Sequence, residues 1–591
     1  MNEWVWAFLF NRKEIIRDLI FLGCVIFACF VPRFGERYFR AIETWGSRLA
    51  RRRITAMVAI FAATIVIRLG VLWYVPVPFP TVQDEFAYLL QADTFVHGRL
   101  TNPTHPLWLY FDTFQVNQHP TYESKYPPGQ GAALAVGQVL GNPWIGVLLS
   151  GGLMCAAMLW MLQGWFPPGW ALVGAVLVMC KVAIFSYWMN SYMGGFVAAI
   201  GGALVMGALP RILRAWRAAV GAGKEDERRA PTTIGNSAIL AVGVIILANC
   251  RPYEGAFFCL PVCFVLLVTF IRRRTASSWR FALARVVAPL LLVGVIGGAF
   301  MGYYNWRGTG KAMLMPYVVN ERTYMDTPTF VWQKLPPPRH YLNPQFELFY
   351  NTMKRHRWAA LGATSLPKAA SKLAYSLLLS MVFFLWPQLS PTVLALGRLL
   401  RDRRMRLLVV QTALVFAATL LPRAWFSLHY IAPLTATVFV LATQGLRHVR
   451  HWMAWSRPVG IGITRAALMF AVLYAPFSNT YHKTRFDNYE PIKMRAQFAD
   501  ELAALPGKHL VLVRYAPQDI ALREWVYNSA DIDGSKVVWA REIPGVSLQP
   551  LLDYFRPRDV WLAEPDTKPP RLSRYDAVAS GPDATRANAT P

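Results

Sequence analysis

The chain has few charged residues, and few of those are acidic. Asp, Glu, Lys and Arg make up 16% of its 591 residues, where a soluble protein has about a quarter. Only 33 residues are acidic against 61 basic ones, which gives a formal net charge of +28. Hydrophobic residues make up 55%, which excludes disorder and argues against an ordinary soluble protein. The composition is typical of a polytopic membrane protein, in which apolar runs alternate with basic loops.

Cysteine and several common motifs are also scarce or missing. The seven cysteines lie in apolar stretches without metal-ligand spacing, so we interpret them as small buried hydrophobes. No glycine-rich phosphate loop opens a predicted helix in the C-terminal region. The N-terminus lacks the basic region and cleavage site of a secretory signal peptide, so no cleaved leader is expected.

Long apolar runs, in contrast, are abundant. A run of roughly 20 residues can cross a bilayer as a helix. A short run at 15–31 either forms a span or lies in the interface, and we favour a span. Eleven further spans are predicted, at 54–75, 143–163, 169–187, 193–210, 235–250, 255–271, 285–304, 374–393, 407–422, 430–446 and 463–479.

Arg and Lys gather in the loops on one side of these spans. By the positive-inside rule that side is cytoplasmic, and the surplus charge faces an anionic leaflet and carries no nucleic-acid signal. Loops 76–142 and 305–373 and the C-terminal region are therefore predicted to lie on the opposite, non-cytoplasmic side. The five basic segments hold 25 Arg and Lys residues and are 33–53, 211–233, 272–280, 398–406 and 447–457.

The C-terminal region differs in composition from the rest of the chain. Its alternation of short apolar runs predicts a small α/β domain with parallel strands over 481–566. The tail 567–591 is rich in Pro, Ala, Thr and Asp and is expected to be disordered. Strands are predicted at His509–Tyr515, Lys536–Ala540 and Asp559–Glu564, and helices at Asp519–Asn528 and Ser547–Phe555.

The first long loop begins with an acidic pair, Asp84 and Glu85. The pair opens an amphipathic stretch, 86–95, that is expected to lie along the membrane surface. A structural explanation is also open, because adjacent acids at a helix N-terminus interact favourably with the helix dipole.

Later in the same loop, Glu123, Lys125 and Tyr126 precede two prolines that fix the backbone. A fixed ammonium near the membrane suits a phosphate group. A rigid turn that leaves Lys125 at headgroup level explains the pattern equally well.

Three short turns on the same side carry further polar residues. Each turn also has a structural explanation. The turn with Asn190 could serve tight helix packing, Arg251 and Glu254 of the second turn could form an ion pair, and His429 of the third could be a structural histidine. Polar groups nevertheless gather at every short turn of one side, while the other side has only basic anchors, so a reaction site is predicted on the polar side. The turns contain Asn190 and Tyr192, then Arg251, Tyr253 and Glu254, and finally His429 and Tyr430.

Together these segments resemble the GT-C glycosyltransferases. The most similar patterns are those of protein O-mannosyltransferases, aminoarabinose transferases of lipid A and related bacterial lipopolysaccharide transferases. The resemblance covers roughly 50–480 and does not extend to the C-terminal domain. It implies transfer of a sugar from a polyprenyl-phosphate donor to a lipid, glycan or protein acceptor on the external face. The segments are DEFAYLLQADTFVHGRLTNPTHP, SKYPPGQG, SYWMNSYMGG, RPYEG and HYIAP.

The resemblance also implies roles for matched residues. Asp84 becomes the candidate general base for the acceptor hydroxyl, and Glu85 an acid that supports Asp84 or a metal. Lys125 corresponds to a lysine near the donor phosphate, and Arg251 is assigned to the same phosphate on physical grounds alone. Substrate contacts are predicted for Tyr126, Asn190, Tyr192, Tyr253, Glu254, His429 and Tyr430.

The sequence leaves open whether a metal cofactor is bound and whether the protein has another function than glycosyl transfer. A divalent cation could be held by Glu123 and His429, but the family pattern has Glu and Lys adjacent, whereas Glu123 and Lys125 are two positions apart. A polymerase or ligase of lipid-linked oligosaccharides, a lipid or glycan transporter, and an assembly scaffold are the rivals. A transporter would carry its polar residues at mid-membrane in repeated halves. The transferase instead requires Asp84, Lys125 and Arg251 to line one cavity that opens to both lipid and the exterior.

Overall fold

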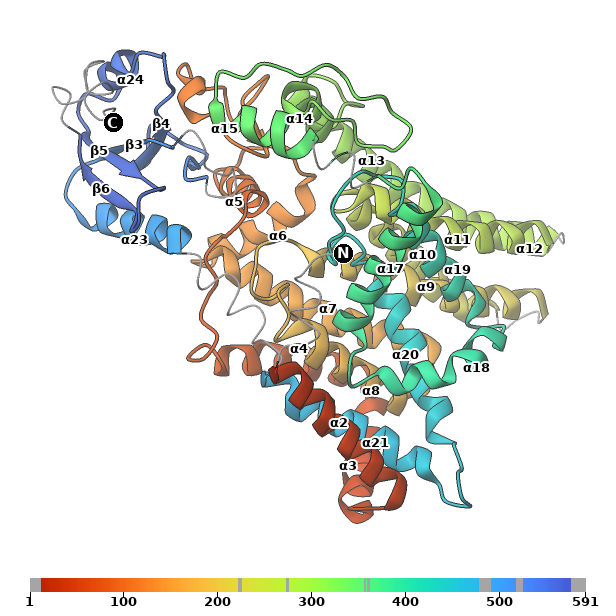
Figure 1. Ribbon diagram of the computed structural model, residues 1–591. Coiled ribbons are helices and arrows are strands. Elements are labelled where there is room, and N and C mark those ends of the chain that lie inside the picture. The colour runs from red at the N-terminus through yellow and green to blue at the C-terminus, as the bar shows by residue number, and fades with distance from the viewer. Residues whose placement is uncertain are drawn as a thin grey trace.

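The computed structural model describes residues 12–221, 226–272, 276–355, 358, 362–477, 490–516 and 524–575 (Figure 1). Every predicted span overlaps a helix in it, although the α-helices at 169–187 and 374–393 end about nine residues before the predicted spans do. Among the described residues, six helices are long and apolar enough to cross a membrane, and three more are apolar but shorter. The helices on the predicted spans are α2 (Arg12–Phe30), α4 (Arg53–Gly70), α7 (Pro143–Trp165), α8 (Pro168–Val178), α9 (Gly195–Gly221), α10 (Asp226–Ala248), α11 (Pro252–Arg272), α13 (Ala288–Thr309), α17 (Leu366–Phe384), α19 (Arg406–Ala418), α20 (Leu434–Arg450) and α21 (Val459–Tyr474).

The bundle is apolar outside as well as inside. Its centre is the packing of α7, α8, α9 and α20 against one another. On its outside, Leu291, Leu292, Val295 and Ile296 of α13 are between 62% and 67% exposed. Neighbouring exposed aliphatic side chains of this kind are expected where a helix faces lipid. The chain is thus a polytopic α-helical membrane protein.

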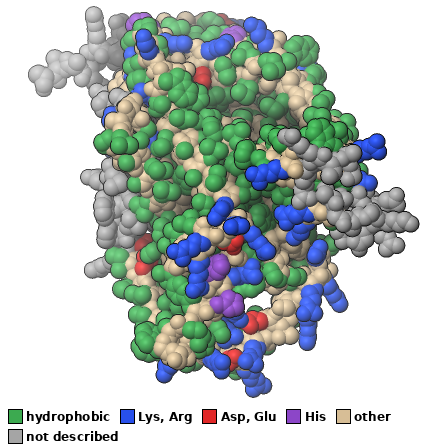
Figure 2. All heavy atoms as spheres, turned by 90° about the vertical axis from the view of Figure 1, so that its right-hand side faces the viewer, with side chains coloured by type: hydrophobic (Ala, Val, Ile, Leu, Met, Phe, Trp, Pro, Cys, Tyr) green, Lys and Arg blue, Asp and Glu red, His purple; other side chains and the backbone are tan. Residues whose placement is uncertain are grey.

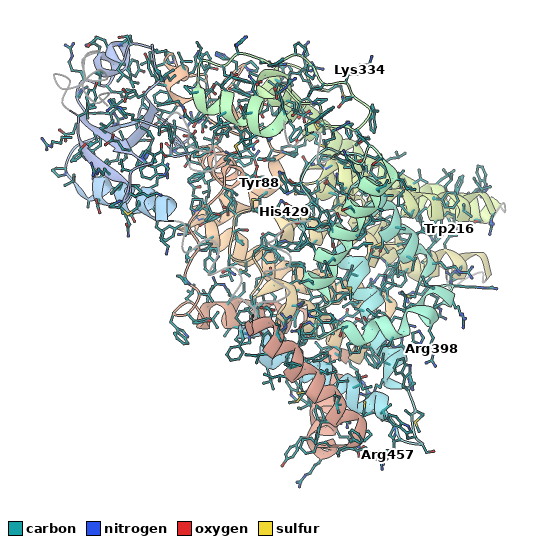
Figure 3. All side chains as sticks on the ribbon, viewed as in Figure 1. Tyr88, Trp216, Lys334, Arg398, His429 and Arg457 are labelled. Carbon is teal, nitrogen blue, oxygen red and sulfur yellow. The ribbon has the colours of Figure 1, made fainter. Side chains whose placement is uncertain are left out.

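The two ends of the bundle differ. Arg398 and Arg457, from two of the basic segments, lie at the lower right in Figure 3, whereas Lys334 of loop 305–373 lies near the top. Figure 2 shows Lys and Arg side chains gathered over the lower half of one side of the molecule, below a largely hydrophobic region. We call these ends the basic face and the loop face. Helices α3 (Glu36–Arg51), α12 (Ala276–Ala282) and α18 (Leu396–Arg401) overlap three of the basic segments, 33–53, 272–280 and 398–406.

The two long loops are themselves folded. Loop 76–142 contains α5 (Gln83–Val96), η1 (Trp108–Phe111), β1 (Val116–Asn117), β2 (Glu123–Ser124) and α6 (Pro128–Val139). Loop 305–373 contains α14 (Pro316–Tyr324), α15 (Pro344–Phe346) and η4 (Glu347–Lys354). Proline stands at the start of α6, α14 and α15, where its fixed backbone angle and missing N–H cost a helix nothing.

The C-terminal domain is a four-stranded sheet in the order β4-β3-β5-β6, with α23 (Glu490–Ala504) and α24 (Gln549–Tyr554). The central strand β3 (His509–Val513) is parallel to β4 (Val537–Arg541) and β5 (Asp559–Glu564), as predicted. The tail prediction is wrong as far as Arg574, because β6 (Arg571–Arg574) pairs antiparallel with β5 and covers its free edge.

The helix predicted at Asp519–Asn528 is also wrong over its described part, residues 524–528, which has no regular secondary structure; residues 519–523 lie outside the described residues. The Asn528 side chain exchanges two hydrogen bonds with the backbone of Trp539, at 2.8 and 2.9 Å. An Asn side chain that pairs with a neighbouring strand in this way competes with helix formation.

The C-terminal domain packs on α5 and on the loop that follows it. The ring of Phe86 stacks on Tyr527 at 4.3 Å between centroids, and Asp93 accepts a 2.7 Å hydrogen bond from the backbone N–H of Ala530. The stretch 86–95 therefore does not lie on a membrane surface, because α6 covers one side of it and the C-terminal domain another. Its buried residues include Ala87, Tyr88, Leu90 and Ala92.

Candidate active site on the loop face

Asp84 is the second residue of α5 and lies half-buried on the loop face. One of its carboxylate oxygens accepts a hydrogen bond from the hydroxyl of Tyr126. The Tyr126 ring in turn stacks on Tyr88 at 4.5 Å, and Tyr88 and His429 are both labelled in the central part of Figure 3. The phenol fixes the carboxylate in one orientation while the second oxygen stays available to a ligand.

Lys125 is buried directly beneath this group. Its ammonium lies 4.7 Å from the ring centre of Tyr317 and 5.3 Å from that of Tyr126. Burial lowers the pKa of Lys125 below its usual value, and the charges of Asp84 and Glu321 oppose that shift. Among the described residues the ammonium has no hydrogen-bond or ion-pair partner, so it is held by aromatic rings alone.

Arg251 reaches the same place from the turn between α10 and α11. Its guanidinium lies 4.9 Å from the ring centre of Tyr430 and interacts electrostatically with Tyr88, Tyr126 and Glu254. The ion pair with Glu254 that the sequence suggested does not form within 4.0 Å among the described residues. Both cations predicted to meet the donor phosphate thus lack an ion-pair partner among the described residues, and Lys125 interacts electrostatically with Asp84.

Loop 305–373 supplies three residues that sequence reasoning missed. Tyr317 and Glu321 come from α14, and Lys354 ends η4. Burial and the charge of Lys125 lower the pKa of Lys354 to about 7, and Asp84 and Glu321 act in the opposite direction. The length of this loop and its place on the polar side were the only sequence signals for a functional role. Nothing in its sequence pattern distinguishes Tyr317, Glu321 and Lys354 from their neighbours.

Six charged side chains therefore form one cluster, which we call the charged cluster. Asp84 acts electrostatically on Lys125, and Asp84 and Arg251 both act on Tyr88 and Tyr430. No two of the six form an ion pair in the described part of the chain. Opposite charges held close but unpaired suit a site in which a charged ligand completes the pairing. The members are Asp84, Lys125, Arg251, Glu254, Glu321 and Lys354.

Glu85 does not face the charged cluster. One carboxylate oxygen accepts hydrogen bonds from the backbone N–H and hydroxyl of Thr81 and from the N–H of Val82, and the other accepts one from the N–H of Tyr192 at 2.8 Å. Burial raises the pKa of Glu85, and these four bonds oppose the shift. Its role is to hold the start of α5 against the 186–194 turn, and thereby to position Asp84.

Replacing Glu85 by Gln is expected to lower the free energy of unfolding by about 1–3 kcal/mol, because the new amide group would face buried N–H donors. Transfer activity per folded molecule should stay within a few-fold of wild type. Thermal unfolding in detergent, beside the exposed control Glu501→Gln, measures the first effect. Loss of activity without loss of stability would instead make Glu85 a catalytic acid.

Asn190, Tyr192 and Tyr253 are also occupied elsewhere. Asn190 accepts a 3.0 Å hydrogen bond from Arg68, a fully buried arginine of α4 that sequence reasoning missed. The hydroxyl of Tyr192 donates to the carbonyl of Pro78, and that of Tyr253 to the carbonyl of Ala418. These hydrogen bonds hold neighbouring turns in place. None of the described contacts supports the substrate-binding roles predicted for Asn190, Tyr192 and Tyr253.

His429 is buried and bound to Tyr187, whose hydroxyl lies 3.0 Å from Nδ1 and accepts the His429 backbone N–H. Burial and the nearby Arg251 lower the pKa of His429 well below its usual value. It borders the charged cluster as a neutral ring, while its neighbour Tyr430 faces Arg251.

The two candidate metal ligands have different neighbours. Glu123 lies against Gly308 of α13, where any side chain would meet its carboxyl group, and neither oxygen has a hydrogen-bond partner. Burial raises the pKa of Glu123 to about 8, so it is mainly protonated at neutral pH. The described residues contain no group of three or more His, Cys, Asp or Glu side chains that could hold a metal ion.

Fold and site together define a polytopic membrane protein with an unpaired charged cluster under folded loops on one face. No protein-family profile matches the chain, and no curated protein matches it in sequence. Several solved structures do resemble it. ArnT from Cupriavidus metallidurans in the apo state is 14% identical over 86% of this chain and 93% of its own, with a TM-score of 0.43.

Two archaeal structures are similar at the same level. The Archaeoglobus fulgidus oligosaccharyltransferase tethered to an acceptor peptide is 12% identical over 78% of this chain, with a TM-score of 0.38, and the chain spans 62% of its length. AglB from the same organism, in complex with an inhibitory peptide and a dolichol-phosphate, is 12% identical over 86% of this chain and 69% of its own, with a TM-score of 0.39. Similarity this low does not extend to substrates or residue roles.

Proposed function

We propose that the protein is a membrane glycosyltransferase that moves a sugar from a polyprenyl-phosphate donor to a lipid, glycan or protein acceptor at the loop face. The observation that supports this most is the meeting of a fixed carboxylate, Asp84, with two uncommitted cations, Lys125 and Arg251. A base for the acceptor and positive charge for a leaving phosphate are the two groups that this transfer needs.

The proposed step is a single displacement. Asp84 accepts the proton of the acceptor hydroxyl as the acceptor oxygen bonds to the anomeric carbon. The bond from that carbon to the phosphate oxygen breaks, and the phosphate stays on the polyprenol, where Lys125 and Arg251 offset its charge. Attack from the face opposite the leaving group would invert the anomeric carbon, by analogy with inverting glycosidases.

The position of the charged cluster also helps to distinguish the transferase from the alternative functions, a transporter and a polymerase or ligase. Its residues come from turns and loops at helix ends, where a lipid-linked donor can enter from the membrane, and not from broken helices at mid-membrane. A polymerase or ligase would share the chemistry but use a lipid-linked oligosaccharide. A divalent cation is kept as a possible addition, with Glu123 and His429 as its candidate ligands.

The direct test combines genetics with reconstitution. Mass spectrometry of surface glycans and glycolipids, with and without the gene, should reveal an acceptor that loses one sugar. Purified protein in lipid nanodiscs should then transfer that sugar from its polyprenyl-phosphate form and release polyprenyl phosphate. Transfer of a whole oligosaccharide would favour the ligase, and unchanged glycans with directional movement of a lipid would favour a transporter.

The proposed location is the inner membrane of a bacterium, with the loop face in the periplasm. Alkaline phosphatase, which folds only outside the cytoplasm, should be active when fused after Pro591 and inactive when fused after Arg403. A green fluorescent protein at the same two positions should give the opposite pattern. Phosphatase activity at Arg403 and not at Pro591 would invert the orientation.

A further inference from the structure

A groove of about 560 Å³ lies on the basic face, far from the charged cluster, between α2, α3 and α21. Its walls include Phe27 of α2, Tyr38 of α3 and Phe470 of α21. Figure 1 shows these three helices together at the end of the molecule opposite the C-terminal domain. Among the described residues that line the groove, Arg465 is the only charged one.

Two glycines shape the groove: Gly35 allows a turn, and Gly462 allows a close contact between helices. Gly35 has a backbone angle φ of +63°, which a glycine adopts readily, and it turns the chain from α2 back into α3. Gly462 of α21 faces the carbonyl oxygen of Ala28 so closely that a Cβ atom would lie 2.5 Å from it. Helices α2 and α21 therefore touch at Gly462, and the larger side chains on either side of that contact form the walls.

Helix α3 has the pattern of a helix in the membrane interface. Tyr38, Ile42 and Trp45 are spaced to share one face and are 74%, 62% and 66% exposed. Arg37 and Arg40 are exposed beside them. Exposed aromatic and aliphatic residues next to arginines place such a helix at the headgroup level of a bilayer. The groove therefore opens where the headgroups and upper acyl chains of lipids lie.

Arg465 gives the groove its charge preference. It is 5% exposed, its guanidinium lies 4.9 Å from the ring centre of Phe39, and its Nε and Nη1 atoms have no hydrogen-bond partner. Its nearest carboxylate, Glu43, is 3.5 Å away and also pairs with Arg450 at 3.0 Å. Arg465 donates one long hydrogen bond, 3.5 Å from Nη2, to this shared carboxylate. A second carboxylate, Glu36, interacts with Arg465 electrostatically but is hydrogen-bonded to Arg40, so positive charge is in excess beside the apolar groove.

We propose that this groove binds one diacyl phospholipid with an anionic headgroup. Its acyl chains lie between α2 and α21, and its phosphate faces Arg465 and the arginines of α3. A buried arginine with unfilled donors is costly within a membrane unless an anion approaches it, and each basic residue near an anionic headgroup contributes about 1 kcal/mol. The bound lipid ties the α2–α3 hairpin to α21. This site is independent of the proposed glycosyl transfer.

The test uses the full chain and two defined lipids, phosphatidylglycerol and phosphatidylcholine. Native mass spectrometry of the detergent-extracted protein should show one phosphatidylglycerol retained in preference to phosphatidylcholine. Arg465→Met should weaken that binding about 5-fold or more, as expected for one lost cation. Arg403→Gln, an exposed arginine of the same face, is the matched control and should bind like wild type.

A second variant tests the groove itself. Cys24 lines it and is exposed, so Cys24→Trp should fill the space, leave every charge in place and also abolish retention of phosphatidylglycerol. Equal retention of the two lipids by the wild-type protein would overturn the proposal, and so would full retention by Cys24→Trp. A dimer that Cys24→Trp dissociates would overturn it too, because the groove would then be an interface between two copies.

Discussion

Replacing Asp84 by Asn should reduce sugar transfer by about 10²–10⁴-fold, the usual contribution of a general base. Asparagine keeps the size of the side chain and can still accept the hydrogen bond from Tyr126, but it cannot take a proton from the acceptor. The loss should appear in kcat, and the protein should still bind polyprenyl phosphate. Radiolabelled transfer in nanodiscs measures it.

Two matched variants make this result interpretable. Asp553→Asn removes an exposed acid from α24 and should leave transfer unchanged. Tyr126→Phe removes only the hydroxyl that orients Asp84 and should give an intermediate loss. Near-normal activity of Asp84→Asn in correctly folded protein would remove Asp84 from the mechanism, and with it the main support for a transferase at this cluster.

Replacing Lys125 by Met should lower kcat about 10²–10³-fold, the range measured when one group that stabilises developing charge is removed. Methionine keeps the length of the side chain and its packing between Tyr126 and Tyr317, so the loss reports the charge and not the packing. Arg251→Gln should behave in the same way, and the double variant should lose less than the product of the two effects if both cations meet one phosphate.

Binding of polyprenyl phosphate gives an independent measure of the same claim. Both single variants should bind it more weakly than wild type, whereas Lys334→Gln, an exposed lysine of loop 305–373, should bind it normally. If Lys125→Met lowered activity but bound polyprenyl phosphate as tightly as wild type, the lysine would act on the acceptor side of the reaction, near Lys354.

Sequence reasoning found the bundle because its signals are local. A run of apolar residues as long as a bilayer is thick, and arginines grouped in alternate loops, require no knowledge of tertiary contacts. Asp84, Lys125 and Arg251 could be predicted as candidates because each stands beside a span or a proline pair, at a level in the membrane that the span count fixes.

Residues whose role depends on distant partners were assigned less well. Glu85 has the chemistry of a catalytic acid, but its four donors include the N–H of Tyr192, which only the fold brings to it. The burial of α5 was missed because the C-terminal domain that covers it is far away in sequence. Lys354, Tyr317 and Glu321 were missed because loop 305–373 has no periodic pattern that indicates which side chains point inward.

The contact between α5 and the C-terminal domain has a consequence for how the protein is made. Asp93, on the same helix as Asp84, is held by the backbone of Ala530, 437 positions later in the chain. The helices of the bundle are inserted in order, and this partner emerges only after 437 further residues have been translated. A partly synthesised protein would already occupy the membrane but would not yet have α5 fixed in place, so a segment synthesised long after α5 completes this part of the site.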